Sequence, residues 1–188
     1  MNNPAQDFRH VGDHRVHSGH VWSVVVADFE SPAGPIQRDV VRSPGSVGIV
    51  PVLFDPEGVA SVVLVEQYRP ALDRSIVEIP AGMRDVADEP PEQTAVRELA
   101  EEVGLTAERI EHLVTIAPSP GMTDATSIIY VATGCTQCER NAQGPEEQAM
   151  SIRHLPLADA VHMVTTGEII DAKTVVALLL VERRIQEL

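Results

Sequence analysis

The stretch from Gly82 to Leu105 constrains this chain more than any other feature. It places three glutamates, Glu98, Glu101 and Glu102, within five residues of an expected helix. Residues three and four apart lie on one face of a helix, so these like charges repel and weaken a bare helix. A hard divalent cation such as Mg²⁺ takes oxygen ligands and would reverse that penalty. The stretch therefore predicts a metal site, although an acidic surface helix would show the same charges.

Hydrophobic patterns and turn residues predict the elements around this stretch. Strands are expected at 22–29, 37–42, 45–54, 60–67, 75–79, 110–117, 126–133 and 150–155. A helix entered through Asp88-Glu89-Pro90-Pro91 should run to about Val103 and stop at Gly104, with the glutamates on a polar face apart from the apolar one. Helices are also expected at 157–165 and 171–186, whereas residues 1–18 read as loosely ordered. This order predicts a mixed α/β sandwich.

Composition narrows the class of protein. The chain has 188 residues, of which 44% are hydrophobic, and this suits one domain with a sizeable core. Its formal net charge of −14 argues against nucleic-acid binding, and any phosphorylated substrate would need metal ions or local arginines. The N-terminal residues are polar and no apolar run reaches the length of a membrane span, so we expect no membrane partner and a cytoplasmic location.

The same stretch resembles the box that defines the Nudix family. That box reads Gly, five residues, Glu, seven residues, then Arg-Glu-hydrophobic-any-Glu-Glu-any-Gly-hydrophobic. The chain departs from it once, with six residues between Gly82 and Glu89, and an extra loop residue is inexpensive. Every later fixed position agrees: Glu89, Arg97, Glu98, Leu99, Glu101, Glu102, Gly104 and Leu105. The resemblance implies a Nudix-type α/β/α sandwich with a mixed sheet, preceded by a small N-terminal antiparallel β subdomain.

The resemblance implies roles for these residues. Glu98 and Glu102 would hold Mg²⁺, or Mn²⁺, against a substrate's phosphates, with the backbone carbonyl of Ala81 as a further ligand. Glu101 would be either another ligand or an acid held just behind the ligands. Metal ions so placed neutralise charge and lower the pKa of a bound water.

The resemblance also implies a catalytic base and an arginine that orients the carboxylates. Arg97 would pair with nearby carboxylates such as Glu89 and orient them. In the Nudix group that hydrolyses ADP-ribose, a Glu from a loop after the box often acts as base. Glu146 and Glu147 are both candidates here, and a solvated acidic loop is the alternative reading.

Residues outside the box resemble the ADP-ribose pyrophosphatase subfamily, of actinobacterial type. Gln67-x-Arg69 and Glu78-Ile-Pro-Ala-Gly82 match two of its segments. Arg69 could bind a phosphate with two hydrogen bonds, or be a surface arginine at a strand end. Ser119-Pro-Gly-Met-Thr-Asp124 resembles a substrate-binding loop, but Ala125 stands where many relatives carry Glu. The implied substrate contacts are Arg69, Trp22, Glu78, Gly121 and Met122.

The implied organisation is an N-terminal segment, 1–44, and a Nudix domain, 45–188. The N-terminal strands would be exchanged between the subunits of a homodimer and would help to bind the substrate. Trp22 could stack on a base there, or fill an interface or core. We expect an enzyme that converts ADP-ribose to AMP and ribose 5-phosphate. The alternatives are hydrolysis of another nucleotide, such as a sugar nucleotide, NADH or an oxidised nucleotide, and a non-catalytic nucleotide-sensing module.

The cysteines and N-terminal histidines suggest other chemistry only weakly. Cys135 and Cys138 form Cys-x-x-Cys without a second ligand pair, so we expect a loop with two reduced thiols. A zinc site shared across a dimer is the alternative. The histidines at 10, 14, 17 and 20 could bind a metal, but a solvated terminal segment fits their spacing better.

Overall fold

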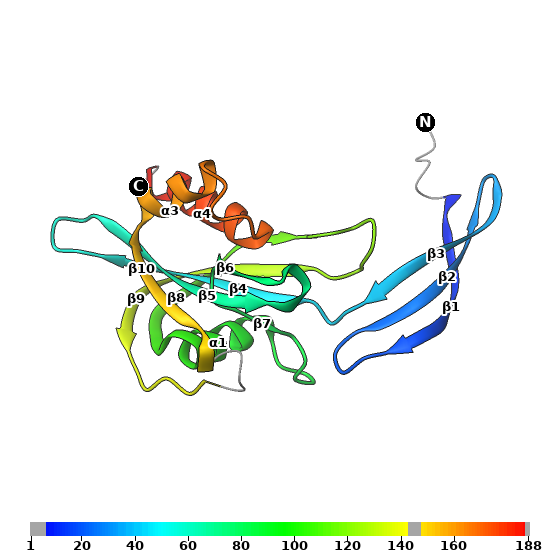
Figure 1. Cartoon of the computed structure of the whole chain (residues 1–188), viewed down its shortest axis with the longest axis horizontal. Helices are drawn as coiled ribbons and strands as arrows, with labels where there is room; N and C mark the ends of the chain where they lie inside the picture. The colour runs from blue at the N-terminus through cyan, green and yellow to red at the C-terminus, as the bar shows by residue number, and fades with distance from the viewer. Residues whose placement is uncertain (1–6, 143–147, 187–188) are drawn as a thin grey trace. The chain divides into compact units, whose positions relative to one another are not determined.

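The computed structural model describes residues 7–142 and 148–186. The chain divides into two compact units, residues 1–45 with 117–126, and residues 46–116 with 127–188. Figure 1 labels the elements of both units. None of the helices in the described ranges combines the length and the apolar character that a membrane crossing requires.

The first unit contains an antiparallel sheet of three described strands in the order β1-β2-β3. Its strands are β1 (Arg9–Ser18), β2 (Ser23–Ser31) and β3 (Gly34–Arg42). The prediction of loose order is wrong for β1, which pairs with β2 from Arg9 to Ser18. The side chain of His14 also bonds Asp28 of β2 at 2.8 Å. This strand was missed because its polar residues give no alternating apolar signal.

Residues 117–126 join the first unit through the end of β3. The Val41 N–H donates to the Met122 carbonyl at 2.9 Å. The carboxylate of Asp124 accepts hydrogen bonds from the Ser43 N–H at 3.0 Å and from Arg42 at 3.2 Å. The loop that carries Gly121 and Met122 is therefore fastened to the N-terminal sheet.

The second unit is built on a mixed sheet that has seven strands within the described residues. They are β4 (Ser46–Phe54), β5 (Ala60–Arg69), β6 (Arg74–Glu78), β7 (Ala81–Met83), β8 (Leu105–Ile116), β9 (Ser127–Gln137) and β10 (Ser151–Pro156), and a short 3-10 helix, η2 (Pro70–Leu72), joins β5 to β6. The main path is β10-β5-β4-β9-β8, with β6 paired to β5 and β7 to β4. β4 and β9 run parallel, whereas the other described pairs are antiparallel.

Strand β4 has three partners, with β9 along one edge and β5 and β7 sharing the other. Its C-terminal end pairs with β5 and its N-terminal end pairs with β7. Between them the Ile49 N–H donates to the Pro80 carbonyl at 2.9 Å. This arrangement holds the turn from Glu78 to Gly82 beside the centre of the sheet.

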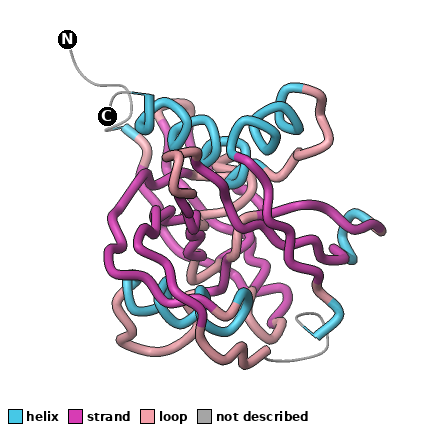
Figure 2. Tube along the Cα trace, turned by 90° about the vertical axis from the view of Figure 1, so that its left-hand side faces the viewer, coloured by secondary structure: helices cyan, strands magenta, loops and turns pink. Residues whose placement is uncertain are grey.

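Helices cover both faces of this sheet, as Figure 2 shows. Helix α1 (Pro91–Val103) packs on one face, and α3 (Leu157–Thr165) and α4 (Ala172–Gln186) pack on the other. Because side chains alternate along a strand, Val47 and Ile49 of β4 face α1, whereas Val50 and Val52 face the helix pair. The α/β/α sandwich with a mixed sheet and an N-terminal antiparallel sheet is confirmed.

Candidate active site

Two buried carboxylates of α1 lie against the backbone of β7. Glu98 is 6% exposed and Glu102 is 3% exposed. The Ala81 N–H donates to Glu102 Oε2 at 2.8 Å. At Gly82, a β-carbon would come within 1.9 Å of Glu98 Oε1, so the backbone approaches this carboxylate as closely as glycine allows. Helix α1 thus brings Glu98 against Gly82 and Glu102 against Ala81, two adjacent residues of the chain.

The predicted separation of these glutamates from the apolar face of α1 is wrong. Ala95, Leu99 and Val103 are buried as expected, and Glu98 and Glu102 are buried beside them. The helix ends as predicted, at Gly104 with φ of 65°. A charge is removed from water at low cost only where hydrogen bonds or counter-charges replace the water. β7 supplies such a hydrogen bond to Glu102, and Arg97 supplies the counter-charge to Glu98.

Arg97 joins three carboxylates. Its guanidinium lies 2.7 Å from Glu98, 2.9 Å from Glu101 and 3.3 Å from Glu89. Burial by itself lowers the pKa of Arg97, but these carboxylates raise it well above its ordinary value. The hydrogen bond from Arg97 is also the main reason that the pKa of Glu89 is lowered. The expected pairing of Arg97 with Glu89 is present, and Glu101 is directed to Arg97.

The extra residue of the box is absorbed before the helix begins. The Glu89 N–H donates to the Val86 carbonyl at 3.3 Å, which closes a tight turn. Asp88 within it takes a left-handed conformation with φ of 60°. Glu89 then accepts a hydrogen bond from Thr94 Oγ1 at 2.8 Å as well as the contact with Arg97. The insertion therefore leaves the helical part of the box in register.

The donor set of this cluster fits a hard divalent cation. Among the described residues no group of three or more His, Cys, Asp or Glu side chains is already gathered to hold a metal. Glu98 and Glu102 nevertheless bring carboxylate oxygens to Ala81 and Gly82. The carbonyl of Ala81 is a further oxygen donor there. Oxygen donors of this kind are what Mg²⁺ prefers. These residues would hold the ion, and Glu101 is engaged by Arg97.

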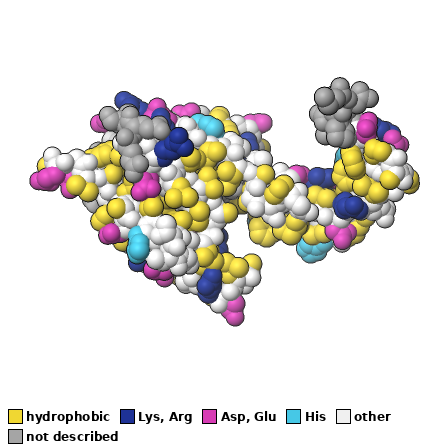
Figure 3. Space-filling model, turned by 90° about the horizontal axis from the view of Figure 1, so that it is seen from above, with side chains coloured by type: hydrophobic (Ala, Val, Ile, Leu, Met, Phe, Trp, Pro, Cys, Tyr) yellow, Lys and Arg dark blue, Asp and Glu magenta, His cyan; other side chains and the backbone are white. Residues whose placement is uncertain are grey.

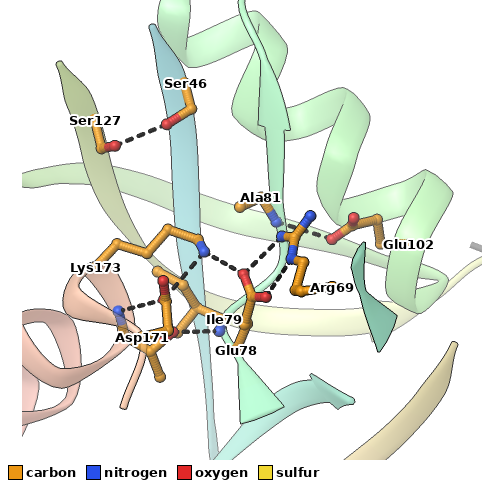
Figure 4. Close-up of polar contacts among 10 residues, drawn as sticks. Ser46, Arg69, Glu78, Ile79, Ala81, Glu102, Ser127, Asp171 and Lys173 are labelled. Carbon is orange, nitrogen blue, oxygen red and sulfur yellow. Dashed lines mark hydrogen bonds and ion pairs between the residues drawn. The ribbon is translucent and has the colours of Figure 1, made fainter. Parts of the chain in front are cut away.

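A second charged group lies at the other end of the same turn. Glu78, 1% exposed, accepts two hydrogen bonds from Arg69, at 2.5 and 2.7 Å, and one from Lys173 of α4 (Figure 4). Lys173 also donates to Asp171 at 3.0 Å. Burial raises the pKa of Glu78, but its bonds to Arg69 and Lys173 outweigh burial and leave that pKa lowered. The pKa of Arg69 is raised, chiefly by Glu78 and further by the charge of Glu102.

Sequence reasoning missed Lys173 and Asp171. A single lysine in the apolar stretch 172–181 was a usable signal, because a lysine there needs a partner. Asp171 was also detectable as the residue before the helix, where Asp is a favoured N-cap. It does cap α4, because its Oδ2 accepts hydrogen bonds from the Thr174 N–H at 3.0 Å and from Thr174 Oγ1 at 2.6 Å.

The other predicted substrate contacts belong to the first unit. Gly121 and Met122 line a cavity of about 290 Å³, together with Phe29, Arg38, Asp39, Val40, Arg42, Pro120, Thr123 and Asp124. Trp22 is 57% exposed and does not line that cavity. Its carbonyl accepts the Gly19 N–H at 2.8 Å in the turn between β1 and β2.

The candidate bases, Glu146 and Glu147, lie outside the described residues. The chain that leads toward them is anchored to the C-terminal end of α1. Arg140 Nε donates to the Glu102 carbonyl at 2.6 Å, and the Cys138 N–H donates to the Gly104 carbonyl at 2.8 Å. Cys135 and Cys138 are free thiols as expected, but Cys135 lies on β9 and not in a loop.

Comparison with known proteins identifies the family. The model of the NUDIX domain matches residues 43–178. The chain belongs to the Nudix family. This Nudix chain is 36% identical to an ADP-ribose pyrophosphatase of Mycobacterium tuberculosis, over 93% of this chain and 83% of that protein. It is 34% identical to an ADP-ribose pyrophosphatase of Bacillus subtilis, with 89% of both chains covered.

Two further similarities concern function and fold. The chain is 38% identical to a methanol dehydrogenase activator of Bacillus methanolicus, over 87% of this chain and 86% of that protein. A solved structure described as an ADP compounds hydrolase superposes with a TM-score of 0.80, covering 97% of this chain and 96% of that one. Its sequence identity of 23% makes this a likeness of fold.

Proposed function

We propose that this Nudix chain hydrolyses ADP-ribose to AMP and ribose 5-phosphate with a divalent cation, Mg²⁺ or Mn²⁺. The observation that carries the proposal is the pair of buried carboxylates, Glu98 and Glu102, held against the Ala81–Gly82 turn. The enzyme is a Nudix pyrophosphatase. The substrate is proposed from the two ADP-ribose pyrophosphatases that match most of this chain.

The reaction adds water to one phosphorus of the diphosphate and breaks its bond to the bridging oxygen. When bound, the cation neutralises the diphosphate and acidifies a water. Glu98 and Glu102 would hold that cation, and Arg97 restrains Glu98. Glu146 or Glu147 accepts the proton of the attacking water. Arg69 contacts a phosphate, while Glu78 keeps its guanidinium in place.

The first unit is proposed to bind the rest of the nucleotide and to form a homodimer by exchange of its strands. The cavity beside Gly121 and Met122 supports a ligand site. Figure 3 shows apolar side chains on the surface of this unit. Phe8, Val11, Val16 and Trp22 belong to this unit and are each more than half exposed. Exposed apolar groups of this number favour an interface, and Trp22 could stack on a base.

A substrate screen tests the proposed function. Purified protein is incubated with ADP-ribose, NADH, sugar nucleotides and oxidised nucleotides, with Mg²⁺ or Mn²⁺, and the released phosphate esters are identified. We expect AMP and ribose 5-phosphate from ADP-ribose in preference to products from the others, and no turnover after chelation of the metal. Preferred turnover of another compound would assign a different substrate. Binding of ADP-ribose without turnover would identify a sensing module.

A further inference from the structure

Four charged side chains form a network beneath the Glu78–Gly82 turn. The buried ion network consists of Arg69, Glu78, Asp171 and Lys173. Glu78 and Lys173 are almost enclosed, at 1% and 12% side-chain exposure, whereas Arg69 is 39% exposed. Lys173 reaches Glu78 from a position 95 residues away in the chain. Lysine is seldom buried without a charged partner, and Lys173 pairs with Glu78.

The two carboxylates of the buried ion network have different hydrogen-bond partners. Asp171 accepts a hydrogen bond from Lys173 at 3.0 Å and also caps α4, where two donors of Thr174 and the helix dipole stabilise its charge. Glu78 Oε2 is shared by Arg69 Nη2 and Lys173 Nζ. The formal charges of two cations and two anions cancel. Without Lys173 the network would carry one net negative charge, in a poorly solvated place, next to the predicted path of a diphosphate.

The position of Arg69 links this network to the active site. Nε and Nη2 face Glu78, and Figure 4 shows the remaining amino group of Arg69 on the side of Ala81 and Glu102. The same α4 turn bonds the backbone there, because the Ile79 N–H donates to Thr174 Oγ1 at 2.8 Å. The N-terminus of α4 therefore contacts both the backbone that carries Ala81 and the carboxylate that orients Arg69.

We propose that Lys173 is a positioning residue for the substrate diphosphate. By pairing with Glu78, Lys173 offsets the negative charge that Glu78 places beside Arg69. More of the positive charge of Arg69 is then left for a phosphate. Lys173 itself touches no substrate. The proposal rests on the proposed function, in which Arg69 is a phosphate contact.

The test is a double-mutant cycle with ADP as the diphosphate probe. Calorimetry with Mg²⁺ measures ADP binding to the wild type, Lys173→Met, Arg69→Gln and the double variant. We expect Lys173→Met to weaken binding about tenfold, as for loss of one charge-assisted contact. The double variant should bind within about twofold of Arg69→Gln alone, because a residue that acts through another shows no added effect once that partner is gone.

Two matched variants separate positioning from folding. Lys173→Arg keeps the charge and should restore ADP binding to within about threefold of the wild type. Arg184→Met removes a cation from the exposed side of the same helix, where it pairs with Glu111 at 3.3 Å, and should bind ADP as the wild type does. Circular dichroism checks each variant, and Lys173→Gln replaces Lys173→Met if the latter does not fold.

Turnover separates this proposal from the proposed function. With ADP-ribose, Lys173→Met should raise KM about tenfold and change kcat less than about threefold, because Glu98 and Glu102 are untouched. Additive losses in the cycle, or a fall in kcat at unchanged KM, would overturn the positioning role. If the wild type binds ADP and the cycle shows coupling between Lys173 and Arg69, but no nucleotide is hydrolysed, the positioning role of Lys173 stands and the proposed hydrolase function is wrong. A wild type that binds no ADP would overturn the positioning role.

Discussion

Gly82 and Glu98 are in such close contact that a β-carbon on Gly82 would lie 1.9 Å from Glu98 Oε1. Gly82→Ala must therefore displace a carboxylate that is proposed to hold the cation. We expect kcat for ADP-ribose to fall at least about a hundredfold, since misplacement by about 1 Å has costs of that order. Gly12→Ala is the control, because a β-carbon there meets nothing within 4 Å. Full activity of the Gly82 variant would show that Glu98 is dispensable.

Glu102→Gln should lower turnover sharply and keep the fold. The amide oxygen can still accept the Ala81 N–H, but the negative charge needed for the cation is lost. Loss of several kcal/mol of charge stabilisation corresponds to about 10²–10³ in rate. Assays with Mg²⁺ and a thermal melt measure both effects. Glu92→Gln, on the exposed side of the same helix, should retain activity, and an active Glu102 variant would refute the metal role.

Glu146→Gln and Glu147→Gln separate the two candidate bases. The variant that removes the base should lose about 10²–10⁴ in kcat with little change in KM, because a base acts in the transition state and not in binding. Steady-state kinetics on both variants identifies which residue it is. If both variants keep the wild-type rate, the base is a different residue.

Glu78→Gln should make stability less dependent on acid. The folded-state pKa of Glu78 is below the ordinary value of 4.5, so this carboxylate stabilises the fold fully above about pH 4.5. That contribution is lost as pH falls through the lowered value. At pH 7 the variant should lose about 3 kcal/mol, since Arg69 keeps its charge without its anion and Lys173 is left with Asp171 alone.

Urea unfolding of that variant at pH 7 and at pH 3 provides the measurement. The difference from the wild type should be large at pH 7 and smaller at pH 3. Glu66→Gln is the matched control, because Glu66 is 41% exposed and its pair with Arg153 is 3.6 Å long. Its loss should stay below about 1 kcal/mol at both values. A constant difference for Glu78→Gln at both pH values would contradict the assignment.

Local patterns predicted most of the second unit. Two apolar runs and the Asp55-Pro56-Glu57-Gly58 turn between them located β4 and β5, and the turn closes through the Gly58 N–H to the Asp55 carbonyl at 2.9 Å. The helix at 157–165 was predicted with its observed bounds. β1 was missed because it is stabilised by pairing with β2, and its polar residues show no pattern that predicts this pairing. No pattern of neighbouring residues predicted that residues 117–126 group with the N-terminal sheet.

The sequence alone determined the spacing of Glu98 and Glu102 on a helix that ends at Gly104, because helix geometry and caps depend on neighbours in the chain. The tertiary structure decided that these glutamates are buried, and that Lys173 meets Glu78. Those outcomes depend on β7 and α4, which reach the site from distant positions in the chain. A charge can be buried only where such partners replace water, so a local pattern can indicate that Lys173 needs a partner but cannot identify that partner as Glu78.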